Sequence, residues 1–313
     1  MTACLAPSNH GTDGQTPPRA ELSFFFDDMD ISGRFADRGF DRVAVLDGKQ
    51  CGIEQKRLIL AFMTYEPVEE QKVSGALIHP YYPVSQRAYR AAGDIAASLR
   101  KEGLDVQQAN HIHIKSILGR LPFLRRGRNT LSYMGVAGSR FHVQILTADE
   151  EIPVTDDLYE TEREYSCGKC RRCMSACPGG AITDDGFERE RCLRYWMLNG
   201  ELPPDEIKEK MGSRLIGCDV CEACCPMNRP GTGEPEEAAL EDLLEGRNIE
   251  RLRMLIGSNY ARKRKLLIQA CLIAGSTRRK DLLDKVREAA EKSGDPAVKE
   301  AAAWAESRME ALY

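Results

Sequence analysis

Residues 167–178 read CGKCRRCMSACP and place four cysteines in the spacing C-x2-C-x2-C-x3-C, followed directly by a proline. This spacing holds a [4Fe–4S] cluster in proteins, because three thiolates on one tight loop bind three corners of the cubane. Where two such clusters occur together, the fourth cysteine binds the other cluster. The segment therefore predicts a second set of cysteines elsewhere in the chain.

The second set lies in residues 218–226, which read CDVCEACCP. Cys218, Cys221 and Cys225 repeat the back of the first motif, and Cys192 supplies the missing front cysteine. The two sets predict a bacterial-type two-cluster ferredoxin module with crossed ligands. Cluster 1 is assigned to Cys167, Cys170, Cys173 and Cys225. Cluster 2 is assigned to Cys177, Cys192, Cys218 and Cys221.

Two alternatives concern these ligands. Cys224 stands beside Cys225 and competes for the same place, but a proline follows Cys225, which favours Cys225. A structural zinc site is the other alternative, and zinc usually takes four ligands from paired C-x2-C knuckles rather than a crossed set of eight. Three cysteines, Cys4, Cys51 and Cys271, are isolated in the sequence and are interpreted as ordinary thiols.

The composition is that of a soluble globular protein. The chain has 313 residues, of which 42% are hydrophobic and 29% charged, so two or three domains are expected and wholesale disorder is excluded. The net charge of −4 argues against a surface that binds nucleic acid or anionic membrane throughout. No apolar run approaches the roughly 20 residues of a membrane span, and the start of the chain does not read as a signal peptide. A cytoplasmic protein is expected.

The cysteine motifs divide the rest of the chain into expected domains. Residues 1–20 read as a flexible polar tail, and 21–160 as an α/β domain that binds a cofactor or substrate. The cluster module occupies 161–230, and a helical domain follows over 238–313. Apolar patterning predicts strands at 41–46, 57–65 and 140–147, a helix ending near 35–39, and a helix over 85–101. Residues 227–237 are rich in Pro, Gly and Glu and are expected to form a linker.

One stretch of the N-terminal domain, residues 106–148, contains no Asp or Glu. It holds six basic residues and three of the five histidines. It is interpreted as either a basic surface or a pocket for an anionic ligand. His111 and His113 are two residues apart, so a strand would place them on one side, where a metal site would need further ligands.

The C-terminal region predicts five short amphipathic helices, the third ended by Gly275. Helix pairs of this kind resemble HEAT-type repeats, which stack into concave binding surfaces. Two groups of cations flank the third helix without an intervening acid: Arg262, Lys263, Arg264, Lys265, Arg278, Arg279 and Lys280. They are interpreted either as a solvated face or as a surface that contacts RNA phosphates.

These motifs together resemble the epoxyqueuosine-reductase-like proteins, which carry a double [4Fe–4S] cluster. The resemblance covers about residues 35–312. It depends most on CPGGAI at 177–182, RCLRYW at 191–196 and GCDVCEACCPMN at 217–228. GRNTLSY at 127–133 and the helical tail support it.

The resemblance implies an overall α+β fold whose N-terminal α/β domain is similar to corrinoid reductases and nitroreductases. It implies cobalamin as a further cofactor and an external electron donor of the flavodoxin or ferredoxin type. It also implies a queuosine precursor in tRNA as substrate, with the helical tail and its cations holding the tRNA. The residues expected to contact the cofactor are Gly127, Asn129, Thr130, Gly138 and Ser139.

The sequence departs from this family at the proton donor. The family carries an aspartate there, whereas the matching region here, residues 106–119, reads VQQANHIHIKSILG. Opening an epoxide to an alkene and water requires a proton donor, so His111 and Tyr133, with His142 as a third candidate, are the proposed acids.

Three hypotheses therefore follow from the sequence. The first is a reductase that passes electrons through two clusters to a corrinoid or a similar cofactor. The second is a non-catalytic electron carrier that docks to a partner oxidoreductase. The third is an RNA-binding protein in which the clusters only stabilise the fold.

Overall fold

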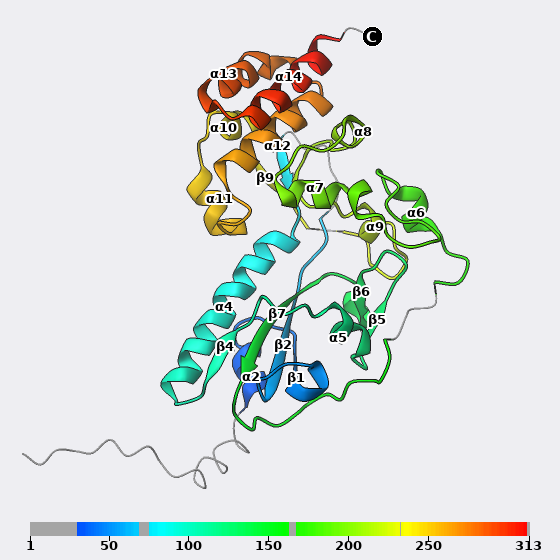
Figure 1. Ribbon diagram of the computed structural model, residues 1–313, viewed down its shortest axis with the longest axis vertical. Helices are drawn as coiled ribbons and strands as arrows, with labels where there is room; N and C mark the ends of the chain where they lie inside the picture. Colours follow the sequence, from blue (N-terminus) through cyan, green and yellow to red (C-terminus); the bar gives the residue numbers. More distant parts are fainter. Residues whose placement is uncertain (1–29, 69–74, 163–166, 232, 312–313) are drawn as a thin grey trace, which may run out of the picture.

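The computed structural model describes residues 30–68, 75–162, 167–231 and 233–311. The tail expected at 1–20 and Cys4 lie outside the described residues. The molecule is elongated, with a β-sheet domain at one end and the C-terminal helices at the other (Figure 1). The cysteine-rich segments lie between these two ends. In the described part of the chain, no helix is long and apolar enough to cross a membrane.

The N-terminal domain is built on a four-stranded sheet with the order β1-β2-β7-β4. The strands are β1 (Arg42–Asp47), β2 (Arg57–Thr64), β4 (Val106–Gln108) and β7 (Phe141–Ala148). All three pairings are antiparallel. An α/β domain would have a mainly parallel sheet, so that expectation is wrong and the domain is α+β. The apolar run in β2 predicts a strand that is buried on both faces. Such a run does not show whether the neighbouring strands are parallel or antiparallel.

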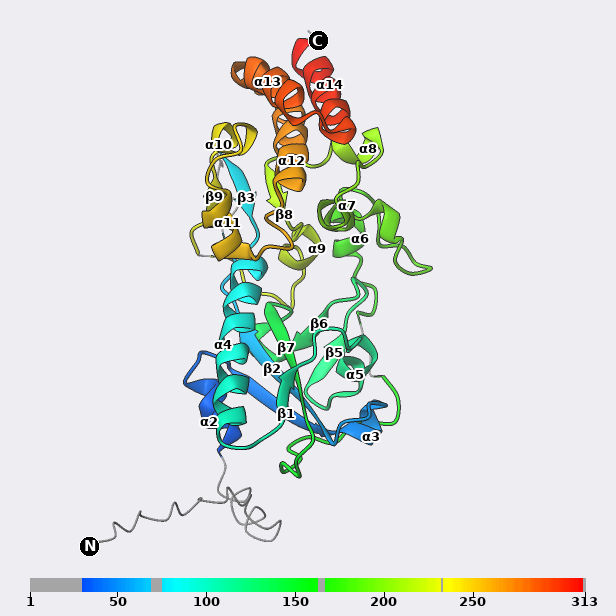
Figure 2. The ribbon, with the colours of Figure 1, turned by 60° about the vertical axis from the view of Figure 1, so that its left-hand side comes forward.

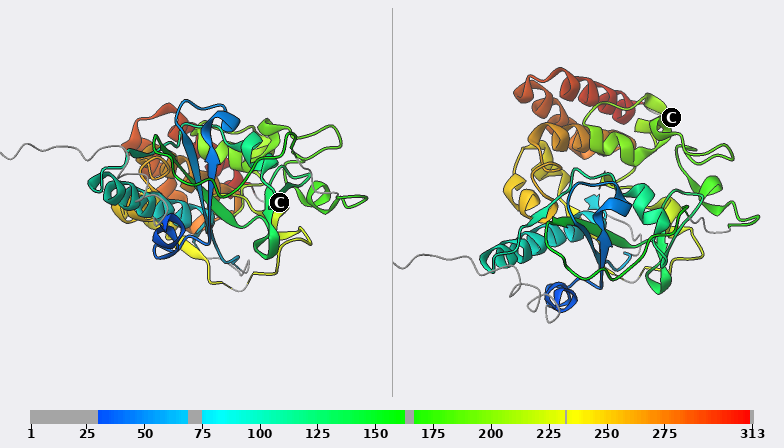
Figure 3. Two further views of the ribbon diagram at one scale, coloured as in Figure 1. Left: turned by 90° about the horizontal axis from the view of Figure 1, so that it is seen from below. Right: turned by 60° about the horizontal axis from the view of Figure 1, so that its bottom comes forward.

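Helices and a hairpin cover the two faces of this sheet. Helices α2 (Ile31–Ala36) and α4 (Tyr81–Lys101) pack on one face (Figure 3). Helix α5 (Lys115–Arg120) and the hairpin of β5 (Leu124–Arg126) and β6 (Ser132–Met134) pack on the other. The short helix α3 (Gly48–Cys51) joins β1 to β2. This cover on both faces explains why β2 is apolar along almost its whole length.

His111 and His113 do not lie on a strand. Strand β4 ends at Gln108, and both histidines follow in the exposed turn before α5. The prediction that one side of a strand carries them is therefore wrong. The alternation of polar and apolar residues continues past Gln108, but no partner strand continues with it.

A second, three-stranded sheet joins regions that the sequence placed in different domains. Its order is β8-β3-β9, formed by β3 (Ala76–Ile78), β8 (Arg214–Ile216) and β9 (Glu236–Ala238). β3 runs parallel to β8 and antiparallel to β9, and Figure 2 shows the three strands in the middle of the molecule. The expected linker at 227–237 thus ends in a strand.

The cluster module contains short helices separated by loops. They are α6 (Arg172–Ala176), α7 (Leu193–Asn199), α8 (Asp205–Lys208) and α9 (Val220–Ala223). Helices α6 and α9 pack against each other, so the two cysteine motifs are brought together although some 40 residues separate them.

The five predicted C-terminal helices are present. They are α10 (Leu240–Leu244), α11 (Ile249–Ile256), α12 (Lys263–Ser276), α13 (Leu283–Ser293) and α14 (Pro296–Glu310). Helix α12 is buried at every position from Leu266 to Gly275. Gly275 does not end the helix. A Cβ there would lie 2.7 Å from the Cα of Ala305, so the glycine allows α12 and α14 to approach closely. A HEAT-type repeat remains a prediction.

Candidate metal centre

The cysteines assigned to cluster 1 surround one cavity. The cavity has a volume of about 200 Å³, and all four of the set line it: Cys167, Cys170, Cys173 and Cys225. Burial raises the pKa of the Cys173 thiol, and the nearby thiols of Cys167 and Cys225 raise it further. Four thiols that come from two distant motifs therefore meet at one place.

The cysteines assigned to cluster 2 form a second group. Burial raises the pKa of the Cys221 thiol, and the neighbouring thiols of Cys218, Cys192 and Cys177 raise it further. Burial also raises the pKa of Cys218 to about 11. Buried thiols that crowd together are unfavourable as free thiolates, and iron offsets this because it binds the deprotonated sulfur. The crossed pairing predicted from the sequence places its ligands in these two groups and stays a prediction.

The arrangement around the cavity fits a [4Fe–4S] cluster. In a [4Fe–4S] cubane each thiolate binds a different iron, so the four sulfurs surround a space rather than converge on a point. The cysteines around the 200 Å³ cavity have that arrangement.

The structure distinguishes the two adjacent cysteines, Cys224 and Cys225. The Cys225 sulfur faces the cavity and accepts a hydrogen bond from the Tyr133 hydroxyl at 3.2 Å. Cys224 is absent from the lining of the cavity, and its Sγ lies 3.8 Å from the carbonyl oxygen of Cys221. This geometry favours Cys225 as the ligand.

Residues expected to contact a cofactor lie beside the cluster 1 cavity. Gly127 and Asn129 line it together with Tyr133. The Asn129 side-chain nitrogen donates to the Tyr133 hydroxyl at 2.8 Å and to the carbonyl oxygen of Cys221 at 3.0 Å. Asn129 thus bridges the β5–β6 hairpin and the second cysteine motif. Thr130 occupies the turn of that hairpin with a φ of 63°.

Gly138 and Ser139 form a joint with Asn228, which follows the second cysteine motif. The Ser139 backbone N–H donates to the Asn228 side-chain oxygen at 2.9 Å, and the Asn228 nitrogen donates to the Ser139 hydroxyl at 2.9 Å. A Cβ on Gly138 would lie 1.9 Å from that oxygen, and its φ is 63°. The close approach requires glycine. These two residues hold the cluster module against the sheet domain.

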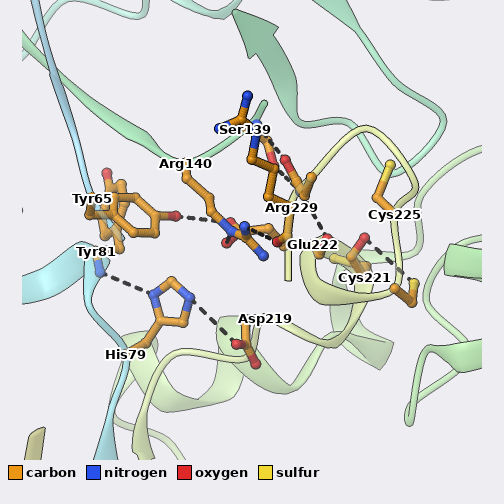
Figure 4. A network of polar contacts seen from close by, with 12 residues as sticks. Tyr65, His79, Tyr81, Ser139, Arg140, Asp219, Cys221, Glu222, Cys225 and Arg229 are labelled. Carbon is orange, nitrogen blue, oxygen red and sulfur yellow. Dashed lines mark hydrogen bonds and ion pairs between the residues drawn. The ribbon is translucent and has the colours of Figure 1, made fainter. Parts of the chain in front are cut away.

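A buried polar network that sequence reasoning missed crosses the same interface (Figure 4). Glu222 accepts a hydrogen bond from the Tyr65 hydroxyl at 2.8 Å and another from Arg140 Nε at 3.1 Å. Burial raises the pKa of Glu222 to about 7, while its bonds to Tyr65 and Arg140 oppose that rise. Arg140 also donates to the backbone carbonyl of Arg229. The only sequence signal is that Glu222 directly follows a cluster ligand.

Aromatic residues at the start of α4 contact the half-buried Arg194, which belongs to the RCLRYW motif. The guanidinium carbon lies 4.7 Å from the ring centre of Tyr81 and 5.6 Å from that of Tyr82, and Nε donates to the Tyr82 hydroxyl at 3.1 Å. Burial lowers the pKa of the adjacent His79 to about 3, so its ring is neutral. His79 Nδ1 accepts the Tyr81 backbone N–H at 3.1 Å, and Nε2 lies 3.9 Å from Asp219 (Figure 4).

The proposed acids occupy different places. Tyr133 is buried at the cluster 1 cavity, and burial and its bond to Cys225 raise the pKa of its hydroxyl. His111 is exposed in its turn and does not line that cavity. His142 lines a separate cavity. Only Tyr133 among the three therefore lies beside the cysteines of cluster 1.

The seven C-terminal cations form two separate surfaces. Lys263 begins the 14-residue α12, whereas Arg278 follows its end, so a helix of about 21 Å separates the groups. Several cations also have partners within the chain. Arg264 Nε lies 2.9 Å from Asp295, and Arg279 pairs with Asp281 at 2.6 Å.

Comparison with known proteins agrees with the cysteine geometry. Residues 166–228 match a family model described as a 4Fe-4S double cluster binding domain. The chain therefore contains a domain of the two-cluster type at the place where the structure gathers the two cysteine groups.

The curated relatives include several epoxyqueuosine reductases. The enzyme of Aliivibrio fischeri is 38% identical over 105 residues, which span 33% of this chain and 27% of the relative. The enzyme of Escherichia coli is 37% identical over 105 residues, which span 33% and 26%. The enzyme of Lactococcus garvieae is 28% identical over 161 residues, which span 47% and 46%. The matches thus cover about a quarter to a half of these relatives.

Solved structures show the same fold. A structure of Bacillus subtilis epoxyqueuosine reductase, with its catalytic aspartate loop swung out of the active site, aligns with a TM-score of 0.69. It has 18% identity over 93% of this chain and 91% of that chain. The enzyme of Streptococcus thermophilus aligns with a TM-score of 0.66 and 20% identity over 90% of each chain. The predicted resemblance to epoxyqueuosine reductases is confirmed.

Proposed function

We propose that this protein is an iron–sulfur reductase that delivers electrons from two [4Fe–4S] clusters to an acceptor bound near cluster 1. The observation that carries this proposal is the gathering of eight cysteines into two groups, one of them around a cavity of about 200 Å³. When bound, two such clusters supply single electrons. The electrons would come from an external donor of the flavodoxin or ferredoxin type.

The chain's own residues hold and shield this centre. The cysteine thiolates bind the iron, and the Tyr133 hydroxyl donates to the sulfur of Cys225. The joint between Asn228 and Ser139 fixes the cluster module against the sheet domain. The buried pair of Arg140 and Glu222 links the two parts of the molecule at the same interface.

The proposed substrate is a queuosine precursor carried by tRNA. The relatives bear the name epoxyqueuosine reductase, and one solved structure of that fold contains an epoxyqueuosine-modified tRNA stem loop. It aligns with a TM-score of 0.70 and 18% identity over 93% of this chain and 91% of that chain. Removing an epoxide oxygen to give an alkene and water consumes two electrons and two protons. Residues 106–148 contain no Asp or Glu, so the two main proton-donor candidates are Tyr133 and His111. Tyr133 is the better placed because it lines the cluster 1 cavity.

The described cavity at cluster 1 is enclosed by the four cysteines and is the space of the cluster itself, so it offers no place for a corrinoid. Asn129 and Ser139, two of the expected cofactor contacts, are also engaged in hydrogen bonds within the chain. We therefore derive no step through cobalamin, and its binding remains a prediction.

The test is anaerobic purification of the full chain, an iron assay and a reaction with an epoxyqueuosine-containing stem loop. We expect about eight irons per chain and, after chemical reduction, loss of one oxygen from the modified nucleoside by mass spectrometry. A Cys173→Ser variant should lose this activity, whereas Cys51→Ser, at an isolated thiol, should keep it. If the protein has its full iron content but the modified nucleoside keeps its oxygen, both with and without added cobalamin, the proposed substrate is wrong. A metal content of about one zinc ion per four of these cysteines would overturn the proposal that the protein is a reductase.

A further inference from the structure

A second cavity lies away from the clusters, between α4, β7 and the loop that joins α11 to α12. Its volume is about 500 Å³, and it shares no lining residue with the cluster 1 cavity. Figures 1 and 2 both show α11 beside the start of α4. None of its lining residues is Asp, Glu, Lys or Arg. Burial lowers the pKa of His142 to about 4, so this ring is neutral as well.

A chain of hydrogen bonds orients the polar groups on the sheet side of this cavity. The Gln144 side-chain nitrogen donates to the Asn110 side-chain oxygen at 2.6 Å. The Gln144 oxygen is then left to accept from His142 Nε2 at 3.4 Å. His142 Nδ1 in turn accepts the Tyr81 hydroxyl at 3.1 Å. This order leaves the Asn110 amide nitrogen as a donor at the end of the chain.

The opposite walls add an amide and an aromatic ring. Gln86, on α4, lines the cavity, and its side-chain amide has no hydrogen-bond partner among the residues that the structure describes. The Tyr260 ring lines the cavity from the helical domain and is held edge-on by Tyr82, with ring centres 5.1 Å apart. The site therefore offers orientable amides beside flat apolar surfaces and no charge.

We propose that this cavity binds the base of a single unstacked nucleoside. Amide side chains recognise the polar edges of bases, and aromatic side chains stack on their faces. A volume of about 500 Å³ falls within the range of small-molecule pockets. The lack of charged lining residues disfavours a phosphate or a carboxylate inside the cavity, because neither would find a counter-charge there.

A cation beside the cavity indicates that the nucleoside belongs to an RNA strand. Arg262 Nη2 donates to the side-chain oxygen of Asn259, a lining residue, at 3.3 Å. The Arg262 side chain is exposed. A base in the cavity would thus place its phosphate near this charge. The RNA assignment rests on the proposed function, whereas binding of the base itself requires no electron transfer.

The experiment measures binding of the four common ribonucleosides and of D-ribose to the anaerobically purified, full-length protein by calorimetry. We expect at least one nucleoside to bind and ribose not to bind. Gln86→Leu and Asn110→Leu should each weaken nucleoside binding about tenfold, because each removes one hydrogen bond. The matched control is Gln107→Leu, at an exposed position on β4 outside the cavity, which should bind as the wild type does.

A single-stranded RNA that contains the preferred base provides the second arm. Arg262→Gln should weaken binding of this RNA and flatten its salt dependence, and should leave nucleoside binding unchanged. Failure of every nucleoside to bind, equal binding of ribose, or an equal loss in Gln107→Leu would overturn the inference. If one of these results is obtained while the protein still reduces the stem loop, the base site is wrong and the proposed function stands. Nucleoside binding without reduction of the stem loop would support the base site and overturn the proposed substrate.

Discussion

The hydrogen bond from Tyr133 to Cys225 gives the sharpest test of the candidate centre. The hydroxyl donates to the cysteine sulfur at 3.2 Å, and the ring is 5% exposed. Replacing Tyr133 with phenylalanine removes only the hydroxyl. Hydrogen bonds to cluster sulfurs set the reduction potential because the added electron makes the sulfur a stronger acceptor. The variant should therefore have a lower potential at cluster 1.

The size of this effect follows from the one bond that is lost. A hydrogen bond contributes about 1 kcal/mol net, and the reduced cluster benefits from it more than the oxidised one. For a one-electron couple, 59 mV corresponds to a tenfold change in the equilibrium, or about 1.4 kcal/mol. A difference of about 1 kcal/mol between the two oxidation states thus lowers the potential by about 40 mV. Cluster 2, whose cysteines lie in the other group, should not change.

The assay is an anaerobic redox titration followed by electron paramagnetic resonance, with iron content measured in parallel. The control variant is Tyr159→Phe, because Tyr159 is 44% exposed and lies outside the cluster 1 cavity. An unchanged potential at full iron content would refute the role of the hydroxyl. A shift of equal size in both clusters would refute its assignment to Cys225.

The remaining predictions concern ligands and stability. Cys225→Ser should remove cluster 1 and about half of the iron, whereas Cys224→Ser should retain the full iron content in the same assay. Gly138→Ala should lower the free energy of unfolding by about 2 kcal/mol or more, since its Cβ would lie 1.9 Å from a side-chain oxygen. Gly135 has a φ of 44° but open space around it, so Gly135→Ala should lower the free energy of unfolding by only about 1 kcal/mol. Equal losses for the two variants in urea unfolding would contradict this reasoning. Burial lowers the pKa of His142 to about 4, below the roughly 6.5 of an unfolded histidine, so the protein should lose stability as pH falls below about 6.5. The His142→Gln variant should lose less stability over that pH range. If the urea midpoint falls with pH at the same slope in the variant and the wild type, this prediction is wrong.

Local patterns were sufficient to predict the cysteine sets and most of the elements. The strand at 57–65 was predictable from its continuous apolar run, and a tail helix such as α13 from apolar residues that recur with the helical period. The position of α4 was predicted only in part, because the helix begins at Tyr81, four residues before the expected start. Its first residues are aromatic and pack around Arg194, a contact that only the folded chain provides.

Contacts between distant segments were not predictable. Tyr65, Arg140 and Glu222 are ordinary residues in their local sequence, and their shared hydrogen bonds span up to 157 positions. The same holds for Gly138, whose need for glycine comes from a side chain about 90 residues later. Local propensity carries no information about such partners, because the energy of these contacts depends on the packing of whole segments.

The sequence by itself predicted the number and order of the cluster ligands. A cubane needs thiolates at short, fixed spacings, and those spacings are covalent properties of the chain. Only the tertiary structure decided what surrounds the ligands: the antiparallel sheet, the sheet formed by β8, β3 and β9, and the neutral cavity below α11. These features arise where elements from different parts of the chain pack together, and the burial that shapes them is a property of the assembled fold rather than of any local stretch.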